Sequence, residues 1–519
     1  MEECMITMNH QFKIFRILFI ISILLFLLVS YSTAQEKKLL TLKDAIAISL
    51  EKSYRMKTLR LSLVQAEENL HAAKGRFKTN ADIRFDMPSW SESVSEIQVQ
   101  NALPVFNTTS RLRFQGIFDI NQPLATDGIF TLRGFVYHRD VSTFTADLTQ
   151  DIKRKEVYTS LSLRFQQPLF TINRLKLGLN NANLNYERTA LRYKRSELDI
   201  VYLVTQAFFN LYQATRLEQI ANDDANQQQE LYDLASKKYE AGLIPEVEAL
   251  QMEVDLAESK NALVEAQGNL ARSEDVFKQL IGLKFSDNIG VQTDFDFSKI
   301  TVDLDKAITM ALANRSEIRE SKIDVELAKL SVKEADARSE IRGDITAFYD
   351  ITGISDPSLP YGSAPGTLFD SSFEDMRRRP NNRGVVFTLS MPIWDWGVNS
   401  AEVAAADANL STVALGLDEQ HKTITREVRE VVGKLNEAEN RLEVLIKNQE
   451  VAQKAFDISI ERFNNGDITV QELALDRNRL TQSKFSYLNA YIDYKLSLAD
   501  LKRKTMFDFE KNQSIIGIE

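Results

Sequence analysis

Histidine and cysteine are the first residue types to examine for catalytic or metal-binding chemistry. The four histidines are scattered along the chain, and none has a cysteine or a second histidine at the spacing that zinc ligands need. The sequence has no glycine-rich loop that could cradle a phosphate, and no serine or cysteine in a recognisable nucleophile motif. We therefore expect no enzyme activity, no metal and no cofactor. The histidines are His10, His71, His138 and His421.

Carboxylates are the other side chains with chemical potential. Most of them fall on expected helices, where acidic residues usually form a solvated face. The formal net charge of −10 argues against a general nucleic-acid binder. Two acids nevertheless share one placement, because Glu248 and Glu472 each stand six residues after a glycine, Gly242 and Gly466. This repetition directs attention to the elements that carry them.

Those elements belong to an internal duplication. A shift of 262 residues places the segment that starts at Leu42 on the one that starts at Leu304, and a shift of 224 residues places Gly242 on Gly466. Such a long repeat predicts a pseudo-symmetric fold, which excludes most enzyme folds. We place the first repeat at residues 35–294 and the second at residues 295–519. The 38-residue difference between the two shifts predicts an insertion in the strand region of the first repeat.

Residues 1–34 are predicted to be a signal peptide. Lys13 and Arg16 precede an apolar run at 17–29, which is shorter than the roughly 20 residues of a membrane helix, and small residues follow at 32–34. An uncleaved inner-membrane anchor is the alternative. The only cysteine, Cys4, precedes the run, so the mature chain would have no disulfide and would depend on packing or oligomerisation.

Each repeat is predicted to contain the same helices in the same order. A first helix, at 41–76 and again at 303–338, precedes a strand region, a very long helix, a glycine turn and a return helix. The long helices, at 175–239 and 400–464, contain no proline and would each extend roughly 90–100 Å, so they need lateral partners. Their apolar spacing of three and four predicts a coiled-coil seam, with an ordinary helical bundle as the alternative. The seam residues are Val201, Val204, Phe208, Leu211, Ile424, Val428, Val431, Leu435, Ala438, Leu442 and Leu445.

The strand regions show period-two alternation. Leu161, Leu163 and Phe165 alternate with polar residues, as in outer-membrane barrel strands, although the strands of a soluble sandwich alternate too. The signal peptide and the attached helices favour a barrel. Segments 89–109 and 355–383 are irregular and predict long external loops. The inserted residues, at 116–123 and 130–135, predict an added hairpin.

The order of these motifs resembles the TolC-like outer membrane efflux protein family, over essentially the whole mature chain. The resemblance implies a mixed α and β membrane protein. Its trimer would form an outer-membrane β-barrel continuous with a long periplasmic α-helical coiled-coil barrel, with two structural repeats per chain. The motifs that carry the resemblance are Leu42-x-x-Ala45-Ile46-x-x-x-Leu50 and its copy at 304–312, Gln167-Pro-Leu-Phe170, Met391-Pro-Ile-Trp394, Tyr239-Glu-Ala-Gly-Leu-Ile244 and Phe463-Asn-Asn-Gly-Asp-Ile468.

The same resemblance implies a function and partners. The chain would be the exit duct of a tripartite pump in a Gram-negative outer membrane, passively exporting small molecules such as drugs. As a homotrimer in outer membrane lipid, it would join a periplasmic adaptor (membrane fusion) protein and an inner-membrane pump of the RND or ABC class, which supplies the energy. A type I protein secretion duct and a non-conducting coiled-coil scaffold are the alternatives.

Finally, the resemblance implies three groups of site residues. In the constriction group, the family's second acidic position falls on Leu475, and Asp476 follows one residue later. A solvated helix face is the alternative for Glu472 and Asp476. The implied residues are Gly242, Leu243, Ile244, Gly466, Asp467 and Ile468 at the periplasmic tip that docks the adaptor, Glu248, Glu472 and Asp476 at the tunnel constriction, and Pro168, Phe170, Pro392 and Trp394 at the strand-to-helix step.

Overall fold

The computed structural model describes residues 38–98, 103–145, 152–292, 297–338 and 340–515. The predicted signal peptide, residues 1–34, lies outside the described residues. The chain folds into two compact units, and each unit takes segments from both halves of the sequence. Among the described residues, the helical unit comprises those up to Thr58 and those within 197–310 and 427–515, and the sheet unit comprises those within 59–196 and 311–426.

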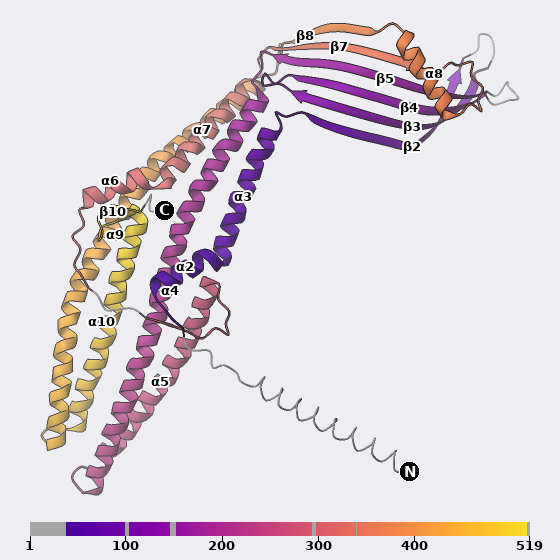
Figure 1. Cartoon of the computed structure of the whole chain (residues 1–519). Helices are drawn as coiled ribbons and strands as arrows, with labels where there is room; N and C mark the ends of the chain where they lie inside the picture. The colour runs from indigo at the N-terminus through magenta and orange to yellow at the C-terminus, as the bar shows by residue number, and fades with distance from the viewer. Residues whose placement is uncertain (1–37, 99–102, 146–151, 293–296, 339, 516–519) are drawn as a thin grey trace, which may run out of the picture. The chain divides into compact units, whose positions relative to one another are not determined.

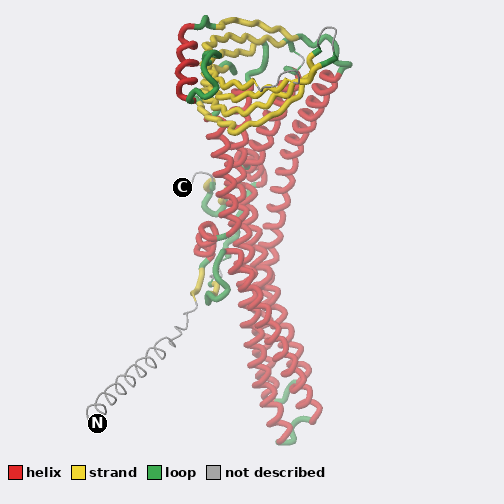
Figure 2. Tube along the Cα trace, turned by 90° about the vertical axis from the view of Figure 1, so that its right-hand side faces the viewer, coloured by secondary structure: helices red, strands yellow, loops and turns green. Residues whose placement is uncertain are grey.

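The sheet unit is built on six antiparallel strands (Figure 1). The first half of the sequence supplies four strands and the second half two, so the insertion predicted in the first half is confirmed as the hairpin of β3 and β4. Figure 2 shows the strands bending round as one curved sheet. In spatial order the strands are β2 (Asn80–Ile97), β3 (Val105–Pro123), β4 (Ile129–Thr145), β5 (Ile152–Leu169), β7 (Arg342–Ile354) and β8 (Asn382–Ser390).

Two predicted loops were wrong. In 89–109, β2 continues to Ile97, and an irregularity in its pairing between Asp86 and Ser89 accommodates Pro88. In 355–383 the structure contains a helix, α8 (Pro365–Arg378), with proline in its first turn. Proline and glycine suggested irregular chain in 355–383, whereas Pro365 and Gly366 stand in the first turn of α8.

The register of the sheet separates an apolar face from a polar face. Leu132 pairs with Leu163, and Phe130 pairs with Phe165, so the apolar positions of neighbouring strands coincide. This confirms the predicted alternation. The apolar face carries Ile83, Phe85, Phe118, Ile120, Phe130, Leu132, Val136, Leu161, Leu163, Phe165, Ile351, Val385, Phe387 and Leu389.

Charged and polar side chains pair across the opposite, polar face. Arg133 donates two hydrogen bonds to Asp119, of 2.6 and 2.8 Å. The Tyr137 hydroxyl donates to Glu156 over 3.0 Å. Polar side chains of this kind are stable in contact with water or with one another. The apolar face instead exposes many hydrophobic side chains that cannot form hydrogen bonds.

The two long helices are close to their predicted bounds. They are α4 (Arg174–Glu240) and α9 (Val398–Asn465). Most of their seam residues are buried as expected, with Val204 and Phe208 at 0% exposure and Leu211 at 1% in the first helix. Val201 in the first helix and Leu445 in the second are only half-buried. Within the sheet unit, Glu320 of α7 (Ser316–Asp336) is buried between Arg192 and Arg195 of α4, at 3.1 and 3.2 Å.

The first helix of each half is broken, so the prediction of one continuous helix was wrong. In the first half, α2 (Leu42–Lys52) ends at Ser53, whose backbone is extended, and α3 (Tyr54–Gly75) begins immediately afterwards. The Ser53 hydroxyl accepts a hydrogen bond from the amide of Met56, so serine caps the new helix. Arg315 makes the same break between α6 (Leu304–Asn314) and α7.

The helical unit is completed by the two return helices, α5 (Glu246–Ile281) and α10 (Val470–Thr505). The sequence predicts that these helices end near Gly282 and near Phe507, and the observed ends, Ile281 and Thr505, lie within two residues of those positions. Short strand pairs close the unit, β1 (Lys38–Leu40) with β6 (Ile289–Val291) and β9 (Phe507–Asp508) with β10 (Gln513–Ser514). Across the described part of the chain, no helix combines the length and the apolar character needed to span a bilayer.

Candidate functional site at the two helix tips

Both helix hairpins turn through a glycine in the left-handed conformation. Gly242 has φ of +71° and Gly466 has φ of +81°. Each amide closes the turn by donating to a carbonyl three residues back, on Tyr239 over 2.8 Å and on Phe463 over 3.1 Å. A Cβ at either position would meet no atom within 4 Å, so the conformation rather than the available space explains glycine here.

The two turns lie over one shared core in the helical unit. Ile244 and Ile468 are half-buried and pack against it, whereas Leu243 is 72% exposed and Asp467 is exposed. Of the six residues predicted for docking, Leu243 and Asp467 therefore present their side chains outward. The core contains Leu231 and Ala235 of α4, Met252 of α5, Phe456 and Phe463 of α9, and Val470, Leu473 and Leu480 of α10.

Lys238 connects the end of α4 to the end of α9. Its Nζ donates to the carbonyl of Phe463 over 2.6 Å and lies 4.3 Å from the centre of the Phe463 ring. A cation that neutralises the carbonyl end of another helix stabilises that end. Sequence reasoning missed this residue, because a lysine near a helix end does not reveal which helix it contacts.

Glu472 has a structural role in its own helix. Thr469 and Glu472 form a capping box, in which the Thr469 amide donates to the carboxylate over 2.9 Å and the Glu472 amide donates to the Thr469 hydroxyl over 3.3 Å. The hydrogen bond from the Thr469 amide lowers the pKa of Glu472 below its ordinary value. Glu248 stands at the matching position of α5, whose N-cap, Pro245, provides no side-chain cap.

Asp476 faces the neighbouring helix. Its carboxylate accepts from the Ser459 hydroxyl of α9 over 2.6 Å and from Arg479 over 3.1 Å. Leu475, at the position where the family has an acid, is 51% exposed. Successive residues of a helix point about 100° apart, so Asp476 would replace an acid at 475 only if α10 rotated by that amount.

A buried polar cluster behind the tips was not anticipated. Arg477 is 8% exposed, and its guanidinium lies 3.9 Å from Asp224 of α4 and donates to Gln228. Asp224 also accepts from Ser259 of α5 over 3.1 Å. Arg477 lies between Leu473 and Leu480 at spacings of four and three, so an arginine inside an apolar seam was the available signal.

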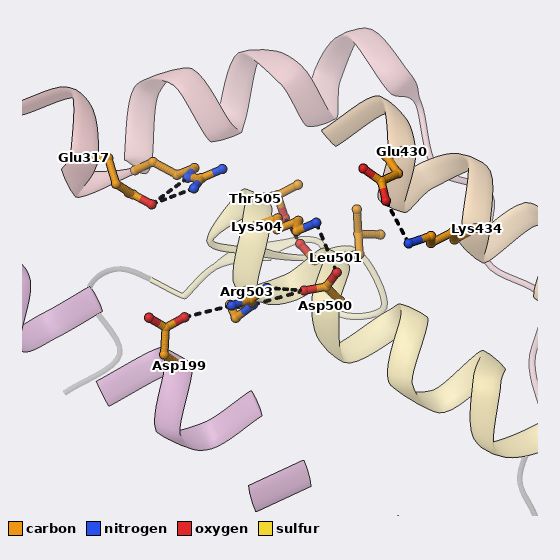
Figure 3. A network of polar contacts seen from close by, with 10 residues as sticks. Asp199, Glu317, Glu430, Lys434, Asp500, Leu501, Arg503, Lys504 and Thr505 are labelled. Atoms are coloured by element: carbon orange, nitrogen blue, oxygen red, sulfur yellow. Dashed lines mark hydrogen bonds and ion pairs between the residues drawn. The ribbon is translucent and has the colours of Figure 1, made fainter. Parts of the chain in front are cut away.

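A second polar cluster joins α4 and α10 farther along the helical unit (Figure 3). Arg503 lies between Asp199 and Asp500, with distances of 2.8 and 2.7 Å, and covers the ring of Tyr202 at 4.5 Å. Lys434 and Glu430 form a separate pair on α9. Of these ion pairs, the one between Arg503 and Asp199 joins α10 to α4, so it fixes the position of the two helices along each other at this height.

The predicted strand-to-helix steps carry exposed aromatic side chains. Phe170 is 65% exposed and directly follows β5, and Trp394 is 74% exposed and lies four residues beyond the end of β8. Both strands contribute to the apolar face. Pro168 lies within β5 and Pro392 just beyond β8. The Trp394 and Trp396 rings lie 5.0 Å apart. Exposed aromatics at strand ends are typical of the boundary between lipid and water.

A curved sheet with one exposed apolar face, joined to long helices that turn through glycine, defines a channel protein of the outer membrane type. The chain belongs to the outer membrane efflux protein family, whose sequence pattern matches residues 140–283 and 307–505. It is therefore a bacterial outer membrane efflux channel with a periplasmic helical part, and not an enzyme. The predicted family, fold class and location are confirmed.

Individual relatives are distant in sequence. The outer membrane protein TolC of Escherichia coli (strain K12) is 20% identical over 350 residues, which are 66% of this chain and 68% of TolC. The structure of CusC, a protein that folds into a transmembrane channel, matches with a TM-score of 0.65 and 15% identity, over 92% of this chain and 95% of CusC. The Campylobacter jejuni CmeC outer membrane channel matches with a TM-score of 0.65 and 14% identity, over 91% and 88% of the two chains. At such identities the solved structures establish the fold.

Proposed function

We propose that this channel is the exit duct of a tripartite efflux pump, which passes small molecules such as drugs from the periplasm to the exterior. The observation that supports the proposal most strongly is the pair of glycine turns over one shared core. Such a tip is packed beneath its surface and offers an apolar and an acidic side chain, Leu243 and Asp467, to a partner. The partners would be a periplasmic adaptor and an inner-membrane pump.

A homotrimer is the assembly that the sheet supports best. The sheet order leaves β2 and β8 as edge strands without a partner in the described chain, and open edges of this length need pairing. Three subunits with six strands each would close an 18-stranded barrel. Barrels of about 16–18 strands hold an aqueous channel, and the polar face carrying Arg133 and Asp119 would line it.

The helical part of the assembly follows from the duplication. The proposed repeats, residues 35–294 and 295–519, each supply one helix hairpin, α4 with α5 and α9 with α10. A trimer would therefore assemble six hairpins into a pseudo-six-fold tube. The coiled-coil seams favour this arrangement, because helices of this length need lateral contacts along their whole length.

The docking proposal is tested with Gly466→Glu. The substitution strains a turn whose φ is +81° and adds a charge at the tip surface. We expect the trimer and its membrane insertion to persist while pump-dependent drug resistance and adaptor co-purification are lost. Gly416→Glu is the matched control, because Gly416 is an exposed glycine inside α9. Normal adaptor binding and normal drug resistance in Gly466→Glu would show that the Gly466 tip does not dock the adaptor.

The constriction proposal concerns Glu248, Glu472 and Asp476, and is tested by conductance in planar bilayers. Three copies of Glu472 in a trimer would repel one another and attract cations. We expect the variant with Glu472→Ala and Asp476→Ala to conduct more and to select less for cations. Thr469→Ala is the control, since it removes the cap and leaves the charge in place. Equal effects of the two variants would show that loss of the helix cap, and not loss of charge, changes the conductance. A trimer that never conducts would exclude a channel and favour the non-conducting scaffold.

A further inference from the structure

Helix α8 is held firmly against the apolar face of the sheet. The Ser372 hydroxyl donates to the carbonyl of Gly353 over 3.0 Å, and the amide of Ile354 donates to Asp375 over 2.9 Å. The approach is close, because a Cβ on Gly353 would lie 2.1 Å from the Ser372 carbonyl oxygen. The side chains that α8 turns outward are therefore displayed by a fixed scaffold.

The height of α8 on the sheet corresponds to the outer surface of the membrane. Thr159, which contacts Ser372, pairs with Gly353, and Leu169 at the end of β5 pairs with Gly343. Ten residues separate the two levels on each strand. A strand crosses the hydrocarbon of a membrane in about 9–11 residues. The long helices connect to the other end of the strands, because α4 begins five residues after Leu169 and α7 ends six residues before Arg342. If those helices are periplasmic, α8 lies at the level of the outer headgroups.

The outward surface of α8 is amphipathic. Phe369 and Phe373 stack with their rings 6.3 Å apart at an angle of 8°, and they are 42% and 39% exposed. Arg377, four residues farther on, places its guanidinium 4.8 Å from the centre of the Phe373 ring. Arg378 and Arg379 pair with Glu374 and Asp375. Among the described residues, the charge of Arg377 has no carboxylate partner.

An apolar groove runs beside this surface. Its volume is about 450 Å³. Phe369, Phe373 and Met376 form one wall, and Ile83 and Phe85 of β2 form the other. The floor is low at Gly116 and Gly134, where the sheet has no side chains. The groove is continuous with the apolar face of the sheet. The lipid hydrocarbon that would surround this face would therefore also reach the groove.

We propose that α8 and this groove bind a phosphorylated lipid of the outer leaflet, with an acyl chain in the groove and the phosphate on Arg377. Arginine matches a phosphate by charge and by paired hydrogen bonds, and the aromatic pair supplies apolar contact beside it. The groove favours a lipid over a free phosphate ion, because a free phosphate would contact Arg377 and leave the groove empty. Binding would fix the channel to the outer leaflet, and it does not depend on the pump partners.

The test titrates the purified full-length trimer with a bisphosphorylated lipid A and counts bound lipid by native mass spectrometry. We expect Arg377→Gln to weaken binding about tenfold, the loss of one charge-assisted contact. The double variant with Phe369→Ala and Phe373→Ala should weaken binding of phosphorylated and dephosphorylated lipid alike. The dephosphorylated lipid should bind the natural chain as weakly as the phosphorylated lipid binds Arg377→Gln.

Arg378→Gln is the matched control, since Arg378 is a neighbouring arginine already paired with Glu374, and it should bind lipid normally. Equal affinity of the natural chain and Arg377→Gln would overturn the proposal. Displacement of the lipid by inorganic phosphate would also overturn it, because the site would then recognise a free ion. Efficient disulfide cross-linking between two copies of the Phe369→Cys variant would show that protein covers the groove and would likewise overturn the proposal.

Discussion

The two tips have the same backbone turn and different packing beneath it. At the α9–α10 tip, Phe463 and Val470 are each 2% exposed. The shift of 224 residues places Tyr239 and Glu246 at the matching positions of the α4–α5 tip, where Tyr239 is 42% exposed and Glu246 is exposed. The duplication has preserved the glycine and the path of the chain but not the buried contacts.

The helix caps differ in the same direction. Thr469 forms a capping box at the start of α10, whereas Pro245 gives α5 no side-chain hydrogen bond. Packing and capping both hold the second tip more firmly than the first. We therefore expect the α4–α5 turn to open locally more often than the α9–α10 turn, which amide hydrogen exchange can measure.

The largest expected effect separates the two aromatic positions. Phe463→Ala should lower the free energy of local opening at the α9–α10 tip by about 3–5 kcal/mol, since it leaves a cavity in the shared core. Tyr239→Ala should change the α4–α5 tip by less than about 1 kcal/mol, because its ring is partly in water. Hydrogen exchange of the tip amides reports both values. Equal losses of local opening free energy in the two variants would show that the two tips are packed equally well.

The next effect concerns the buried charge behind the second tip. Asp224→Ala should cost about 2–3 kcal/mol, because it leaves Arg477 buried without its carboxylate. The double variant with Asp224→Leu and Arg477→Leu should recover most of that loss. At the first tip, the shift of 224 residues places Glu253 at the position of Arg477, and Glu253 is exposed. Glu253→Ala should therefore change the free energy of unfolding by no more than about 0.5 kcal/mol. Thermal unfolding of the trimer provides the measurement.

The cap contributes less. Thr469→Ala should raise the exchange of the first amides of α10 by an amount equivalent to about 1 kcal/mol, because the side-chain acceptor for the Glu472 amide is lost. Thr469→Ser keeps the hydroxyl and should behave like the natural chain. An unchanged exchange rate in Thr469→Ala would show that packing alone holds this helix end.

The smallest effect is a dependence on pH. The folded-state pKa of Glu472 lies below its ordinary value of 4.5. The contribution of the ionised carboxylate is therefore complete above pH 4.5 and is lost as the pH falls through the lower folded-state pKa. Exchange at the start of α10, corrected for the intrinsic pH effect, should rise in that range for the natural chain and not for Glu472→Gln.

Several features were predictable because they repeat with a fixed period. The seam at Val204, Phe208 and Leu211 follows from the helical spacing, and the apolar face at Leu161 and Leu163 from the strand spacing. The breaks at Ser53 and Arg315 were not predicted, since the apolar pattern continues across them. Helix α8 was missed because the prolines and glycines at its start and on either side of it resembled those of a loop.

The sequence by itself determined the family, the order of the elements and the positions of the two glycine turns, because each depends on neighbouring residues or on the spacing between them. Only the tertiary structure showed that Arg477 meets Asp224, that Glu472 caps its own helix and that α8 lies on the apolar face of the sheet. The pairing of Arg477 and the placement of α8 join segments that are far apart in the chain. The cap depends on the side-chain conformation of Glu472, because an acid three residues into a helix can turn either to its own N-terminus or to solvent.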